Sequence, residues 1–350
     1  MDHSILAAYE KQNFRKVLFV ALILILIIIS ALIAITIGPI KMTLEDSLHV
    51  VFHHILPFFF EAPNSLVDGV VWQVRVPRVL TGFMVGFGLA ISGAVMQPIL
   101  RNPMATPYTL GISSAAGFGA ALVIGFGGSL VSGASMLVVS AFAFSLLVVM
   151  IITTISKWKS ATPEIIILTG IALSYLFNAG IRLLQYLVDP IYTKEMVFWL
   201  AGSLYKGNWE NLLYISIAVF ILSAYLIYKS KELNAMSAGD EVATSVGINV
   251  SRTRINLLIA SSMLTAVLVS FTGTIGFIGL VAPHITRMIL DGDNVFVVIG
   301  SGFVGAFLVI ISDIIALNII APTSLPIGVI TAFMGVPLFL YLIFRMKRGK

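Results

Sequence analysis

The feature that most constrains this chain is the absence of charge over stretches long enough to cross a membrane. No charged residue occurs between Asn102 and Ser156, or between Val79 and Leu100. An α-helix rises about 1.5 Å per residue, so about 20 apolar residues cross a hydrocarbon core of roughly 30 Å. With 59% hydrophobic and 11% charged residues, the sequence is also too apolar for a soluble domain. We therefore predict an all-α integral membrane protein.

Turn signals divide the apolar stretches into about ten transmembrane helices, which we assign to a single domain, residues 1–350. The cluster Gly125–Gly133 divides the uncharged stretch after Asn102, and Thr272-Gly273-Thr274 divides the apolar stretch after Arg254. The predicted spans cover about 17–37, 79–100, two within 102–156, 165–187, 211–228, two short ones within 255–290, 295–316 and 327–344. Glycines in the second span, such as Gly86 and Gly93, predict close packing between helices.

Basic residues set the predicted orientation. Lys11, Arg15 and Lys16 precede the first span, and Arg345 and Lys347 follow the last. Because basic residues beside spans favour the inner side, we predict a multi-pass protein of the cytoplasmic membrane with both termini cytoplasmic. The first apolar run has no small-residue cleavage site after it, and we expect it to be retained as a span.

Charge and motif content exclude several functions. The net charge is +5, but the basic residues lie beside apolar runs, which argues for membrane orientation and against nucleic-acid binding. The absence of cysteine excludes disulfides and thiolate metal sites. No G-x-x-x-x-G-K-[ST] loop is present, so a transporter of this sequence would take its energy from a partner rather than bind ATP itself.

Four motifs along nearly the whole chain carry a family resemblance. They are WQVRVPRVLTG (72–82), GLAISGAVMQPILRNPMATPYTLG (88–111), GTIGFIGLVAPHITR (273–287) and LPIGVITAFMGVPLFL (325–340). In this order they resemble the FecCD or BtuC-like permease subunits of iron-siderophore, haem and vitamin B12 ABC importers. The resemblance implies a type II importer fold of ten helices, and a permease that translocates a metal chelate by alternating access.

The resemblance also implies partners. In the family, two permeases work with two cytoplasmic ATPases, and an extracytoplasmic binding protein delivers the substrate. We expect a homodimer of this chain, embedded in membrane lipid, with no cofactor bound directly and ATP used by the partner subunits. The substrate class comes from the resemblance, not from individual residues.

The inner loop between spans six and seven, residues 239–254, is where the family docks its ATPase. The resemblance implies coupling residues at Gly239, Asp240, Glu241, Ala243, Val246 and Gly247. Two short helices hinged at Gly247 would convert ATPase closure into motion of the spans. An ordinary solvated loop of the same composition remains an alternative.

Arg75 and Arg78 begin the second span on the outer side, where the family meets acidic residues of its binding protein. Charge complementarity would set the register and the encounter rate of that docking. Arginines that extend to the membrane interface are the simpler alternative. The chain departs from many relatives at two outer positions, with Leu317 in place of an arginine and Ser324 in place of a glutamate.

The family's inner gate corresponds to the loop before the fifth span, which holds Ser160 and Thr162. These hydroxyl residues could equally cap that helix beside Pro163. Polar residues in the spans could line the substrate path because unpaired polarity is costly in lipid, or could bond neighbouring helices. We take Asn178 and Gln185 as pathway candidates; Arg182, His284 and Asn318 share the same polarity, although helix bonding is the favoured interpretation of His284.

Other functions fit the sequence less well. A molybdate or other oxyanion importer is an alternative within the family. A secondary transporter needs titratable groups within the spans, whereas Glu164, Asp189 and Asp313 all lie near span ends. A membrane enzyme should show clustered His, Asp or Glu. His49 and His53 have the i,i+4 spacing of zinc ligands, but without an arranged carboxylate a polar stripe on an interfacial helix is favoured, and no metal site is predicted.

Overall fold

The computed structural model describes residues 3–38, 40, 42–126, 134–158, 162–290, 292–321 and 323–347. Within these residues every regular element is a helix, which confirms the predicted all-α class. The elements are α1 (His3–Thr36), α2 (Leu44–Ile55), α3 (Ser65–Val70), η1 (Val71–Arg75), α4 (Val76–Ile99), α5 (Ile112–Phe126), α6 (Ala134–Trp158), α7 (Pro163–Leu187), α8 (Pro190–Leu200), α9 (Trp209–Ala238), α10 (Asp240–Ser245), α11 (Val250–Thr272), α12 (Ile278–Leu290), α13 (Asn294–Asn318) and α14 (Ile327–Lys347).

Seven of the described helical segments are long and apolar enough to cross a membrane. They are 14–36, 65–99, 135–157, 163–187, 209–238, 250–272 and 294–318. Three shorter apolar helical segments, 112–126, 278–290 and 327–341, occupy the remaining positions where the sequence predicted spans. The structure therefore has helices at each of the predicted spans, and the chain is a multi-pass membrane protein.

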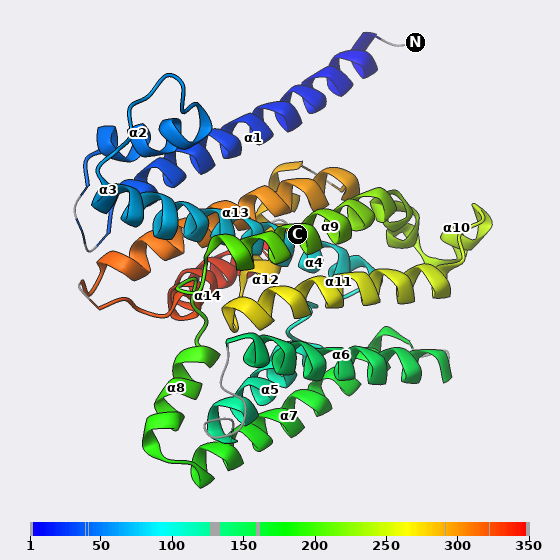
Figure 1. The fold of residues 1–350 in the computed structure, drawn as a ribbon. Helices are drawn as coiled ribbons and strands as arrows, with labels where there is room; N and C mark the ends of the chain where they lie inside the picture. Colours follow the sequence, from blue (N-terminus) through cyan, green and yellow to red (C-terminus); the bar gives the residue numbers. More distant parts are fainter. Residues whose placement is uncertain are drawn as a thin grey trace.

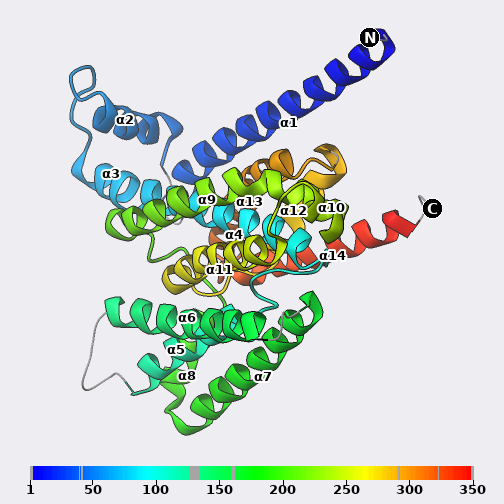
Figure 2. The ribbon, with the colours of Figure 1, turned by 90° about the vertical axis from the view of Figure 1, so that its right-hand side faces the viewer.

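Helix α4 lies at the centre of the bundle. Figures 1 and 2 show it surrounded by α9, α11, α12 and α13, with α5–α8 grouped on one side and α1–α3 on the other. A Cβ atom on Gly86 would clash with the backbone of Gly305 in α13, and one on Gly93 would clash with the backbone of Gly279 in α12. These contacts confirm the predicted close packing, in which backbones approach where side chains are absent.

Several elements differ in extent from the prediction. Helix α9 continues ten residues past the predicted end at Tyr228, because its inner part carries charged residues that a hydropathy pattern does not count as span. The second short span was predicted correctly, since α12 has 13 residues, but α11 is a full-length helix of 23 residues. The predicted turn between them is confirmed, because α11 ends at Thr272 and Gly273 has a φ of +69°. The predicted outer loop 189–209 contains helix α8.

Candidate functional site

The segment between α9 and α11 contains one short helix flanked by glycines. Helix α10 has six residues; Gly239 before it has a φ of +128° and Gly247 after it a φ of +85°. Nothing lies within 4 Å of a Cβ added to either glycine, so backbone conformation, not space, requires glycine there. The sequence predicted two short helices hinged at Gly247; the structure has α10, a short connection over residues 246–249 that contains Gly247, and then the long α11, so the segment contains a single short helix.

The six predicted coupling residues lie on and around α10. Glu241 and Val246 are exposed, whereas Ala243 is fully buried and fastens the short helix to the bundle. An exposed glutamate and an exposed valine on the same short segment offer both a charged and an apolar contact to another protein. This surface can therefore receive a partner while Ala243 keeps it joined to the spans.

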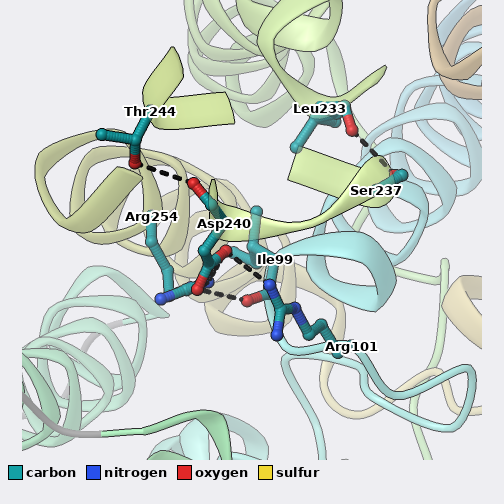
Figure 3. A network of polar contacts seen from close by, with 7 residues as sticks. All are labelled: Ile99, Arg101, Leu233, Ser237, Asp240, Thr244 and Arg254. Carbon is teal, nitrogen blue, oxygen red and sulfur yellow. Dashed lines mark hydrogen bonds and ion pairs between the residues drawn. The ribbon is translucent and has the colours of Figure 1, made fainter. Parts of the chain in front are cut away.

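Asp240, the first residue of α10, joins three elements (Figure 3). Its carboxylate lies 2.7 Å from Nη2 of Arg101, in the loop after α4, and 2.9 Å from Nη2 of Arg254 in α11. Arg254 also donates from Nε to the backbone oxygen of Ile99, the last residue of α4, at 2.9 Å. A displacement of α10 would therefore be transmitted to α4 and α11 through charge-assisted hydrogen bonds. Sequence reasoning missed both arginines, because no local pattern pairs residues so far apart in the chain.

The two arginines predicted to lie on the outer side, Arg75 and Arg78, are engaged within the chain. Arg75 is 7% exposed and donates to the backbone oxygens of Ile35 (2.8 Å) and Thr36 (2.6 Å) and to that of Ile40. These carbonyls belong to the last turn of α1 and to the segment after it. A basic side chain near the C-terminus of a helix can hydrogen-bond the last carbonyl groups, which have no partner within the helix. In the described structure, Arg75 thus holds the end of α1.

Arg78 forms a bidentate ion pair with Asp313 of α13, with both N–O distances at 2.8 Å. Leu317 and Ser324, the two positions that depart from many relatives, line the same cavity of about 300 Å³ as this pair. The structure thus brings the outer arginines and the two departures together. The predicted docking of a binding protein at Arg75 and Arg78 stays a prediction.

Polar side chains at i, i+4 and i+7 on α7 share one face of that helix. Asn178, Arg182 and Gln185 line a cavity of about 380 Å³ together with Ser113 of α5 and Thr274. Asn178 also lines a second cavity of about 330 Å³, which extends along α7 past Ser174 to Asn102. Because polar groups are costly in lipid, this face of α7 is suited to a water-filled path or to contact with another chain.

Of the two gate candidates, Thr162 lies at the N-cap of α7 with an extended backbone (φ −66°, ψ 159°), but its side chain makes no capping hydrogen bond. Ser160 lies outside the described residues. Thr162 thus occupies the N-cap position that the sequence allowed, without a capping hydrogen bond from its side chain, and its role in the gate stays a prediction.

The outer histidines pack within their own segment. Nδ1 of His53 hydrogen-bonds with the backbone oxygen of Phe60 at 2.9 Å. His54 pairs with Asp68 at 2.7 Å and stacks on Trp72 with ring centroids 4.0 Å apart. Among the described residues, no group of three or more His, Cys, Asp or Glu is arranged to hold a metal ion.

Several known proteins are similar to this chain. The model of the FecCD transport family matches residues 23–345. The chain is 39% identical to a protein of Methanocaldococcus jannaschii named as an ABC transporter permease, over 97% of this chain and 98% of that one. It is 34% identical to the hemin transport system permease protein HmuU of Yersinia pestis, over 82% and 88%. It is 32% identical to the molybdate import system permease protein MolB of Haemophilus influenzae, over 97% and 98%.

A solved structure shares the arrangement of helices. It is that of a metal-chelate type ABC transporter in an inward-facing conformation, with a TM-score of 0.81 and 31% identity. The match covers 92% of this chain and 97% of that one.

Proposed function

The chain belongs to the FecCD transport family, and from this premise we propose that it imports a metal chelate across the cytoplasmic membrane by alternating access. It is a permease subunit of an ABC importer and not an enzyme, because in this family ATP hydrolysis belongs to a separate subunit. Haem and ferric siderophores are the proposed cargoes, since relatives are named for hemin and for iron(3+)-hydroxamate.

The polar face of α7 is the observation that carries this proposal. Its two cavities, of about 380 and 330 Å³, are both lined by Asn178, and we take the two together as the track along the helix. Leu168, Tyr175 and Leu183 on α7 are also exposed, so this helix presents a broad uncovered surface. A second copy of the chain packed against α7 would enclose the track, with Asn178 and Gln185 in its wall and Thr162 at its inner end.

The ATPase partners are proposed to dock at α10. Glu241 and Val246 would contact the ATPase, and Asp240 would pass its motion to α4 and α11 through Arg254 and Arg101. The extracytoplasmic binding protein would dock near Arg78 at the other end of α4. The termini would then lie in the cytoplasm with α10.

A molybdate or related oxyanion is the second proposed cargo. Arg182 lines the larger cavity, and no described residue in that lining is a carboxylate. A cationic wall without a carboxylate suits an anionic cargo, and the molybdate permease MolB is one of the relatives.

Uptake into proteoliposomes tests the proposal. The chain is reconstituted with the ATPase and binding protein encoded beside it, and uptake of haem, ferric siderophores, a corrinoid and molybdate is measured with and without ATP. We expect ATP-dependent uptake of one chelate. Uptake of molybdate alone would select the oxyanion, and no ATP-dependent uptake by a verified complex would contradict import by this chain.

A further inference from the structure

A cavity of about 400 Å³ lies at the α10 end of the bundle, where α4, α9 and α12 terminate. It shares Asn102 with the second cavity along α7, and its other lining residues come from α4, the loop after α4, α9 and α12. Its polar lining consists of Gln97, Arg101, Asn102, Ser237, His284 and Arg287. The described residues that line it include two arginines and no carboxylate.

Arg287 of α12 has only neutral acceptors in the described part of the chain. Nη1 donates to Oδ1 of Asn294 at 3.1 Å, and Nη2 makes a long contact of 3.4 Å with the backbone oxygen of Ala94. Asn294 is itself held by Asn234 and Ser237, so the acceptor is fixed in place. Partly buried charges in proteins are normally paired with an opposite charge. An anion in the cavity would supply that charge.

Gln97 of α4 has an unused donor beside the same cavity. The residue is 4% exposed, and its Nε2 is buried with no hydrogen-bond partner among the described residues. Nδ1 of His284 also lacks a partner there. A buried amide without an acceptor costs free energy, so the site favours a ligand that presents oxygen acceptors.

Arg101 contributes the most accessible donor. Its side chain is 49% exposed and pairs through Nη2 with Asp240, a carboxylate shared with Arg254. A guanidinium has five N–H donors, so this pairing leaves others available. Arg101 and Arg254 share this one carboxylate in direct ion pairs.

We propose that this cavity is a binding site for a phosphoryl group, carried by an anionic lipid headgroup or as free phosphate. Arg287, Arg101 and Gln97 all line the cavity and carry N–H donors, and guanidinium groups match phosphate oxygens in a bidentate geometry. The position of the cavity allows a lipid headgroup as well as free phosphate. Headgroup phosphates lie at the depth where membrane helices end, and basic pockets between helices bind such headgroups. The proposed phosphoryl site does not depend on which cargo the transporter carries.

The test uses the full-length purified chain and three variants. Binding of inorganic phosphate is measured by calorimetry, and retention of phosphatidylglycerol against phosphatidylcholine is measured by native mass spectrometry. The variants are Arg287→Gln, Gln97→Met and, as the matched control, Arg252→Gln, which removes an exposed arginine of α11 that does not line the cavity. We expect Arg287→Gln to weaken binding by about tenfold or more, and Arg252→Gln to leave it unchanged.

Gln97→Met separates ligand binding from structure. Because Nε2 of Gln97 has no partner within the described residues, its removal is expected to leave thermal stability unchanged or higher while binding weakens. Selective retention of phosphatidylglycerol that both site variants lose would identify a lipid headgroup; calorimetric binding of phosphate without that selectivity would identify the free anion. Equal binding by the wild type, Arg287→Gln and Gln97→Met, or no binding of either probe, would overturn the proposal. If Arg287→Gln does not fold, Gln97→Met decides alone.

Discussion

The two ends of α4, predicted from the sequence to be its outer and inner ends, both carry arginine ion pairs, but the two clusters are built differently. At the outer end, Arg78 and Asp313 pair one to one, with side-chain exposures of 12% and 6%. At the inner end, Arg101 and Arg254 share Asp240, whose side chain is 41% exposed. A buried pair has no alternative partner, whereas a shared, hydrated carboxylate can exchange partners at low cost. The outer cluster therefore fixes α4 against α13, and the inner cluster is suited to motion.

Breaking the outer pair should have the largest effect on stability. Arg78→Gln leaves the buried carboxylate of Asp313 without its partner, and we expect the free energy of unfolding to fall by about 3–5 kcal/mol. Chemical denaturation in detergent micelles, followed by tryptophan fluorescence, measures this change.

The double variant Arg78→Gln with Asp313→Asn is its control. Two neutral amides remove the unpaired charge, so the double variant should recover much of the lost stability. If the single and double variants were equally unstable, the ion pair would not be what fixes α4 to α13.

Much of this fold follows from the sequence, and the two clusters show where prediction ends. Uncharged runs and turn residues locate α7 to within two residues of its start at Pro163, because lipid imposes one length and one periodicity. The inner part of α9 was missed, since it leaves the apolar layer and carries charges such as Lys229 and Glu232. Hydropathy does not report which distant loops meet, so the contact between Arg101 and Asp240 was not predictable.

Substitution of Gly239, the glycine before α10, should have the next largest effect on stability. Gly239→Ala places a side chain at φ +128° and ψ 151°, a region used almost only by glycine, and should cost about 1–3 kcal/mol of local stability. Hydrogen exchange of the α10 amides measures it. Gly69→Ala is the control, because that glycine lies in α3 with open space around it. An equal loss at both positions would show that the α10 backbone is not specially constrained.

Neutralising the shared carboxylate of Asp240 tests whether this cluster transmits motion from α10. Asp240→Asn removes two ion pairs at a hydrated site and should cost no more than about 1 kcal/mol of stability. Because the link from α10 to Arg101 and Arg254 is weakened, we expect ATP hydrolysis by the assembled transporter to continue while uptake per ATP falls. Asp68→Asn is the control: it removes the carboxylate that pairs with His54, and the side chain of Asp68 is 28% exposed. This variant should leave the ratio of uptake to ATP hydrolysis unchanged. An unaltered ratio in Asp240→Asn would exclude this carboxylate from coupling.

Glu241→Arg should have the smallest effect on stability and still affect function. The side chain is exposed and forms no ion pair in the described part of the chain, so the free energy of unfolding should change by no more than about 0.5 kcal/mol. Reversal of charge on the surface proposed for the ATPase should nevertheless weaken assembly, which co-purification of the two subunits measures. Glu195→Arg makes the same charge reversal at an exposed residue of α8, a helix at the far end of the bundle from α10 (Figure 1). This variant should leave assembly intact. Normal assembly and uptake with Glu241→Arg would move the ATPase contact away from this face of α10, and Asp240 would then serve only to hold α4 and α11 together.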